Sequence, residues 1–118
     1  MAEFLTTNGI TSNIERILID AKTNLFLISP YLQVSNTFLE RLIDASIRNV
    51  RIVIVYKEDS LKPAERDKLA SLQTLRLYYS YNLHAKCYFN ESNLVIGSLN
   101  LYEYSEKNNR EMGVLTIW

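Results

Sequence analysis

The feature of this sequence that most constrains its fold is a pair of buried strands separated by one amphipathic helix. Residues 24–29 form an apolar run that stops at Pro30, and a second apolar run covers 50–56. Short runs of this kind are typical of strands buried on both faces. Between them, Ser35 can cap a helix whose apolar stripe comprises Phe38, Leu39, Leu42, Ile43 and Ile47. Strand, helix and strand in this order predict a βαβ unit with parallel strands.

The same α/β pattern extends to either side of this unit. Apolar residues at helical spacing predict a first helix over 11–22, with capping side chains between Thr11 and Asn13. Pro63 suits the first turn of a helix over 62–72, and 75–79 has the composition of a strand. From His84 onward we expect extended segments at 84–90, 93–97 and 111–117, separated by polar turns at 90–93 and 106–109. The predicted fold class is α/β.

Composition limits the kinds of function open to the chain. Its 118 residues, 47% of them apolar, suit a single domain over 1–118. Thirteen basic residues balance thirteen acidic ones, so a site for a polyanion must be local. One cysteine and one histidine cannot make a disulfide within the chain or a multi-Cys zinc site, so we predict no metal and no cofactor. Without a signal sequence or a long apolar run, we expect a cytoplasmic protein with no stable membrane association.

The residues best suited to chemistry occur in two short motifs. On a strand, His84 and Lys86 would project from one face, and the same alternation pairs Ser98 with Asn100. If the two segments lie side by side, a nucleophile and three hydrogen-bond donors converge on one small volume. That set suits a tetrahedral phosphate. Either motif alone has an ordinary interpretation, a structural histidine or a turn, and it is their joint occurrence that favours a site.

With these residues the sequence resembles the phospholipase D superfamily, whose signature is His-x-Lys, four residues, Asp, then Gly-Ser-x-Asn. His84, Lys86, Gly97, Ser98 and Asn100 match it, and the family's later glutamate resembles Glu111. The resemblance implies an αβα sandwich with a central mixed β-sheet flanked by helices. It covers most of the chain.

The sequence departs from the family pattern at two points. Glu91 stands where the family has Asp, and the segment between Lys86 and Gly97 is about one residue shorter. Because Glu91 lies an odd number of residues from His84, it would face away from the site on a continuous strand, so we expect a structural role for it. The shorter segment falls in the 90–93 turn, where hairpin loops tolerate such differences.

The resemblance also implies a mechanism without metal. In the family one histidine attacks phosphorus to form a phosphohistidine, and a second histidine protonates the leaving oxygen. This chain has one histidine, so either two chains pair as a homodimer about a twofold axis or the chain is inactive. Glu111 would orient the imidazole of His84, while Lys86, Asn100 and Ser98 would hold the phosphate oxygens.

Eight tyrosines add a second kind of candidate site. Tyr102 and Tyr104 follow Asn100 and could stack on bases of single-stranded nucleic acid, whereas Tyr78 and Tyr88 suit ordinary strand positions. The favoured function is therefore a metal-independent phosphodiesterase acting as a nuclease. Alternatives are a phospholipid-hydrolysing enzyme, or a catalytically weak module that binds nucleic acid or serves as a scaffold. The chain stops just after its last predicted strand, where family half-domains continue with a helix, so a natural short form and a piece of a longer protein both stay open.

Overall fold

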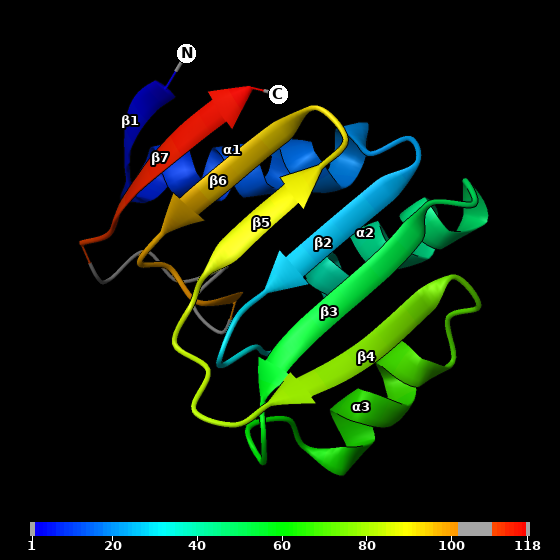
Figure 1. Ribbon diagram of the computed structural model, residues 1–118. Helices are drawn as coiled ribbons and strands as arrows, with labels where there is room; N and C mark the ends of the chain where they lie inside the picture. The colour runs from blue at the N-terminus through cyan, green and yellow to red at the C-terminus, as the bar shows by residue number, and fades with distance from the viewer. Residues whose placement is uncertain (1, 102–109, 118) are drawn as a thin grey trace.

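The computed structural model describes residues 2–101 and 110–117, and its helices and strands alternate along most of the chain (Figure 1). In chain order these elements are β1 (Ala2–Thr6), α1 (Thr7–Asp20), β2 (Asn24–Ile28), α2 (Asn36–Ile47), β3 (Arg51–Lys57), α3 (Pro63–Ala70), β4 (Leu75–Ser80), β5 (Cys87–Asn90), β6 (Asn93–Gly97) and β7 (Met112–Ile117).

All seven of these strands join one mixed sheet, in the order β1-β7-β6-β5-β2-β3-β4. The strands β2, β3 and β4 are parallel, and the other neighbouring pairs are antiparallel. Leu25 pairs with Ile52 in β3, so the predicted βαβ unit is confirmed. The α/β class and the mixed sheet are confirmed with it.

The core lies between the sheet and the three helices of the described residues, which all cover the same face (Figure 1). Alternate strand residues such as Leu25, Ile54 and Tyr88 point into this core and are fully buried. The described residues thus form two of the three layers of the expected sandwich. On the opposite face the rings of Phe26 and Phe89 stack 4.8 Å apart, and Ile96 is exposed.

The helix boundaries show which sequence signals were reliable. Ser35 caps α2 as predicted, because its Oγ accepts a hydrogen bond from the backbone N–H of Phe38 at 3.2 Å. Pro63 occupies the first turn of α3. However, α1 begins at Thr7, earlier than expected, because Thr11 and Asn13 donate to carbonyl oxygens one turn back instead of capping the helix.

Strand β1 was not predicted, because its sequence carries no strong strand pattern of its own. It forms through antiparallel pairing with β7, in which Phe4 lies opposite Val114 and Leu5 opposite Gly113. Of these two β1 side chains, Leu5 joins the core and Phe4 is exposed. The strand is therefore a product of tertiary pairing.

One edge of the sheet collects the ends of strands from distant parts of the sequence. The parallel strands β2, β3 and β4 end there, β6 ends there, and β5 and β7 begin there (Figure 1). In α/β proteins the carboxyl ends of parallel strands are the usual place for ligands. This edge carries the residues that the sequence singled out.

Candidate active site

His84 and Lys86 lie in the connection from β4 to β5, which crosses the ends of the parallel strands (Figure 1). The prediction that they belong to a strand over 84–90 is wrong, because β5 begins only at Cys87. Its neighbour β2 ends at Ile28, opposite Cys87, and Pro30 beyond it has no N–H to extend the pairing. Strand alternation therefore does not determine where these two side chains point.

The two side chains differ in exposure although both are near the sheet edge. His84 is exposed, and Lys86 is half-buried, with its Nζ donating to the backbone oxygen of His84 at 3.3 Å. The backbone oxygen of Lys86 accepts from Gly97 N at 3.3 Å. This bond ties the His-x-Lys segment to the segment that carries Ser98.

Ser98 and Glu111 are brought into direct contact, although they are far apart in sequence. Ser98 Oγ donates to a carboxylate oxygen of Glu111, and it also accepts from the backbone N–H of Met112 at 3.1 Å. The backbone N–H of Glu111 in turn donates to Thr7 Oγ1, at the start of α1, at 2.8 Å. Three elements thus fix the position of this hydroxyl and carboxylate.

Asn100 follows Ser98 at the same edge, between two buried leucines. Among the described residues its Oδ1 has no hydrogen-bond partner although the atom is buried. The backbone around it is held firmly, because Tyr88 Oη donates to Leu99 O at 2.5 Å and Leu101 N donates to Ser29 Oγ at 3.0 Å. A buried acceptor without a donor is unfavourable, which makes Asn100 Oδ1 a candidate contact for a bound group that donates a hydrogen bond, whereas Asn100 Nδ2 is the atom that can donate to a phosphate oxygen.

Two glycines allow the strands under the site to approach closely. A Cβ on Gly97 would lie 2.8 Å from Met112 O, and a Cβ on Gly113 would lie 2.9 Å from Ile96 O and 3.1 Å from Ile10 of α1. No side chain fits at either position without moving the backbone. The motif glycine is therefore needed for strand packing, and Gly113, which the sequence motif does not include, is its counterpart on β7.

Glu91 has the structural role expected of it, on the far side of the molecule from His84. Its carboxylate accepts hydrogen bonds from the backbone N–H groups of Lys22, Thr23 and Asn24 at 2.9 to 3.1 Å. Partial burial would raise the pKa of this carboxyl, but the bonds from Thr23, Asn24 and Lys22 outweigh it and lower the pKa to about 2. Glu91 therefore fastens the β5–β6 turn to the loop before β2.

Three further sequence predictions concern the stacking tyrosines, metal binding and membrane association. Tyr102 and Tyr104 lie outside the described residues. Within the residues that are described, no group of three or more His, Cys, Asp or Glu side chains has the arrangement of a metal site. In the same part of the chain no helix is long and apolar enough to cross a membrane.

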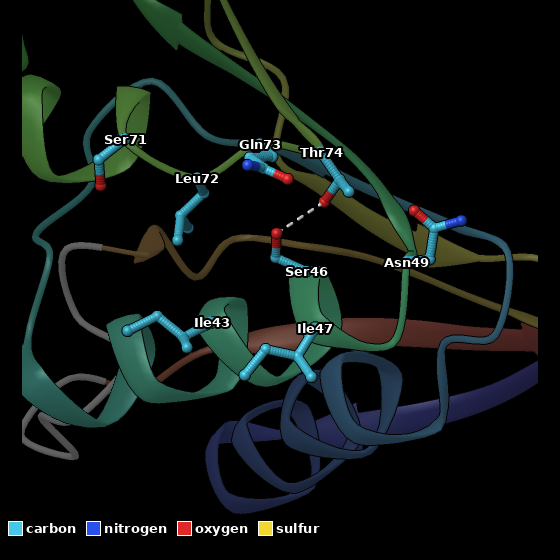
Figure 2. A pocket seen from close by; sticks show the side chains of 8 residues that line it. All are labelled: Ile43, Ser46, Ile47, Asn49, Ser71, Leu72, Gln73 and Thr74. Carbon is cyan, nitrogen blue, oxygen red and sulfur yellow. Dashed lines mark hydrogen bonds between the residues drawn. The ribbon is translucent and has the colours of Figure 1, made fainter.

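A cavity of about 430 Å³ lies at the other end of the strands, between α2 and the segment that leads into β4 (Figure 2). Thr74 donates to Ser46 Oγ across it at 3.1 Å, and Ile43, Ile47 and Leu72 supply its apolar lining. Its lining residues include no histidine, cysteine, carboxylate or cation. The chemistry of the motif residues is thus separate from this cavity.

The edge with His84, Lys86, Ser98 and Asn100 provides an imidazole, a cation, a hydroxyl and a carboxamide. Glu111 adds a carboxylate bonded to the hydroxyl. A nucleophile with surrounding donors matches the needs of a reaction at a phosphate group, in which negative charge develops on the oxygens.

Comparisons with known proteins agree with this description. A family model described as "Cardiolipin synthase, PLD-like domain" matches residues 14–117. A search of curated protein sequences finds no match. Among solved structures, Nuc from Salmonella typhimurium, described as a phospholipase D family member, has a TM-score of 0.76 at 19% identity, over 100% of this chain and 84% of that one.

Two further solved structures share the fold. NucT from Helicobacter pylori has a TM-score of 0.82 at 11% identity, over 98% of this chain and 84% of that one. TrmBL2, described as an archaeal chromatin protein with a novel mode of DNA binding, has a TM-score of 0.69 at 16% identity, over 97% of this chain and 44% of that one. At these identities the structural likeness establishes the fold, while the family match covers most of the sequence. The chain therefore belongs to the phospholipase D superfamily, as a PLD-like domain of the family that the cardiolipin synthase model describes.

Proposed function

We propose that this protein is a metal-independent phosphodiesterase, and that its substrate is a nucleic acid. The observation that carries the proposal is the arrangement at one sheet edge. An exposed His84 follows the parallel strands, and the Ser98 hydroxyl there is held by Glu111 and by the backbone of β7. Membership of a phosphodiesterase superfamily supports the reaction class.

The proposed reaction has two displacements at phosphorus. A neutral ring nitrogen of His84 attacks the phosphorus, the bond to the leaving oxygen breaks, and that oxygen takes a proton from a second histidine. Water then attacks the phosphorus of the phosphohistidine and gives its proton to the second histidine. The P–N bond breaks, and His84 is free again. The phosphate oxygens are stabilised during both steps by Lys86, by Asn100 Nδ2 and by Ser98, whose single hydroxyl hydrogen turns from Glu111 to the substrate.

Glu111 has two tasks in this proposal. One carboxylate oxygen accepts the hydrogen bond from Ser98 and so directs the hydroxyl. The other oxygen accepts from the ring nitrogen of His84 that does not attack, which fixes the tautomer and stabilises the developing positive charge. Ser98 and Glu111 therefore act as a linked pair.

The second histidine must come from another chain, because this sequence contains one. We propose a homodimer with a twofold axis at the site, so that the partner's His84 serves as the acid. The exposed position of His84 supports this arrangement, because a neighbouring chain can reach it. We also propose that the dimer works in the cytoplasm. A chain with one cysteine forms no internal disulfide, which suits a reducing compartment.

One alternative to a nucleic-acid substrate, a phospholipid, has support of its own. The family model that matches this chain is described as a cardiolipin synthase domain, which favours a phospholipid as substrate. Against this, the structural relative TrmBL2 is described as binding DNA. We therefore favour a nucleic acid over a phospholipid.

Incubation with labelled oligonucleotide and with labelled phospholipid vesicles, each in excess EDTA, tests the proposal. We expect cleavage of the oligonucleotide, and we expect a labelled adduct on His84 when the reaction is stopped by denaturation without acid and mapped by mass spectrometry. Activity that disappears in EDTA and returns with magnesium, with no adduct on His84, would refute the mechanism. Cleavage of the vesicles alone would support the lipid alternative.

Sedimentation at micromolar concentration tests the dimer separately. We expect a dimer, and mixing inactive His84→Ala chains with wild-type chains should lower activity more than simple dilution does. A monomer with full turnover would contradict the shared site.

A further inference from the structure

Two exposed tyrosines stand at the end of β4, next to the segment that carries His84. The side chains of Tyr79 and Tyr81 are 57% and 67% exposed, and their rings meet edge to face with centroids 5.9 Å apart. Tyr79 also approaches Tyr56 of β3, at 6.4 Å between centroids. Aromatic rings normally bury most of their surface, so a fixed pair left open to solvent is a ready contact for another flat ring.

Beside this pair lies a cavity of about 260 Å³ with walls of unlike chemistry. Tyr56 and Leu61, both buried, and the ring of Tyr79 provide its apolar surface. Its remaining lining residues, Glu58, Asp59 and Arg66, are charged. Glu58 lines this cavity together with Tyr79, and its negative charge, followed by the influence of Tyr79, raises the pKa of the Tyr81 hydroxyl.

The tyrosine pair is close to the proposed nucleophile along the chain. Tyr81 and His84 are three residues apart, which limits the separation of their Cα atoms to about 11 Å. Lys57 at the end of β3 pairs with Ser80, and Glu58 N donates to Ser80 O at 3.2 Å. The cavity and the phosphate site therefore occupy the same edge of the sheet.

The charges determine what such a cavity can accept. The two carboxylates Glu58 and Asp59 outnumber the one cation, Arg66, so the net charge of the lining disfavours a second phosphate group. A carboxylate is a good acceptor for the amino groups on base edges, as when Glu or Asp accepts from the N4 amino group of cytosine. A flat aromatic wall with carboxylate acceptors matches an unpaired nucleobase.

We propose that Tyr79 and Tyr81, with Glu58, form a stacking subsite for an unpaired base of the strand whose phosphodiester lies at His84. The inference rests on the proposed nuclease function and adds a substrate class to it, single-stranded nucleic acid. In a duplex both faces of a base are stacked and its edge is paired, so a duplex base does not reach the tyrosines. Stacking on an aromatic side chain tolerates any base, and the carboxylate favours bases with an amino group.

The test compares a single-stranded oligonucleotide with an abasic oligonucleotide of the same length and charge. Binding is measured by fluorescence anisotropy with His84→Ala protein, and cleavage with chains that keep His84. We expect Tyr81→Ala and Tyr79→Ala to weaken binding of the normal oligonucleotide by about 5- to 150-fold relative to the abasic one. In cleavage, the same variants should raise KM on the normal oligonucleotide more than they lower kcat.

Two single variants serve as controls. Tyr81→Phe should keep the preference for bases, since its ring still stacks. Tyr78→Ala removes a tyrosine of similar exposure, 54%, from the opposite face of β4, and should leave binding unchanged. Both substitutions control for general damage to the strand.

The outcomes separate this inference from the function on which it rests. Cleavage with unchanged base preference in both tyrosine variants would overturn the subsite and leave the nuclease function intact. No cleavage, but base-dependent binding that the variants lose, would overturn the nuclease and keep the subsite. If protein that keeps both Tyr79 and Tyr81 bound normal and abasic strands equally, the subsite would be overturned in either case.

Discussion

The two ends of the β5–β6 hairpin show opposite uses of polar side chains. At the turn, Asn90 is buried and fully engaged, because its Nδ2 donates to Ile17 O at 3.1 Å and its Oδ1 accepts from Ser92 N and Asn93 N at 2.8 Å. At the open end, His84 is exposed and Asn100 Oδ1 is buried without a partner among the described residues. One end satisfies its polar groups internally, while the other keeps them available.

This difference separates stability from chemistry on the same two strands. The turn end is tied to α1 and to the loop before β2 through Asn90 and Glu91. We infer that this anchoring fixes the hairpin, so that its other end presents the site residues in a constant position. Substitutions at the two ends should therefore affect different measurements.

The largest effect should come from His84→Ala. Loss of the nucleophile should reduce turnover of an oligonucleotide by at least ~10³-fold, since enzymes that lose their nucleophile keep only the residual catalysis from binding and charge stabilisation. Because the side chain is exposed, the midpoint of thermal unfolding should stay within about 3 °C. A stability loss as large as that of a core mutation would show that the two ends are not separate.

Ser98→Ala tests the open end without touching the nucleophile. It removes the hydroxyl that donates to Glu111 in the free protein and that we propose turns to a phosphate oxygen, so kcat should fall by about 10²- to 10³-fold, as for loss of one transition-state donor. Ser98→Thr, which keeps the hydroxyl, is the matched control. If kcat were unchanged and only the unfolding free energy fell, Ser98 would belong to the structural group.

Asn90→Ala should have the largest effect on stability at the turn end. It leaves Ile17 O and the N–H groups of Ser92 and Asn93 without their partner, which should cost about 2–4 kcal/mol of unfolding free energy. Urea unfolding measures this. Below the unfolding midpoint kcat should change less than tenfold, and a kcat loss to the level of His84→Ala would contradict the comparison.

Glu91→Gln should have a smaller effect that depends on pH. The folded pKa of about 2 lies below the ordinary value of 4.5, so the stabilisation is complete above pH 4.5 and is lost as the pH falls towards 2. After allowance for solvent screening at this accessible carboxylate, we expect about 1–2 kcal/mol. Wild-type and Gln chains should therefore differ at pH 7 and converge near pH 2. A constant difference across this range would mean that the charge of Glu91 does not contribute.

The sequence predicted the regular parts of this molecule better than the irregular ones. The βαβ unit, the Ser35 cap and Pro63 at a helix start depend on local patterns, and the structure confirms them. The predicted strand at His84 failed because its length depends on where β2 ends, which is a property of the neighbour. A strand's limits are determined by pairing, and pairing is not visible in a local pattern.

The site shows the same division. The sequence predicted Ser98 and Glu111 as site residues, and the structure brings them together in a bond to each other that spacing could not predict. The expectation for Glu91 proved correct for a different reason. It faces away because it binds the loop at 22–24, whereas strand alternation does not extend to His84. Gly113 was missed because only the opposing carbonyl of Ile96 reveals its constraint.

The pairing of β1 with β7 has a consequence for the order in which the chain folds. Leu5 lies opposite Gly113, so this contact joins residues 108 positions apart and closes a long loop. The strand β1 has no other strand neighbour in the described sheet, so its strand pairing depends on β7 alone. Contacts this distant form late, after the local βαβ unit. Because Thr7, directly after β1, holds the backbone of Glu111, the candidate site is completed in the same late step. We therefore expect that nascent chains gain activity only after β7 has been synthesised, with no partly active folding intermediate.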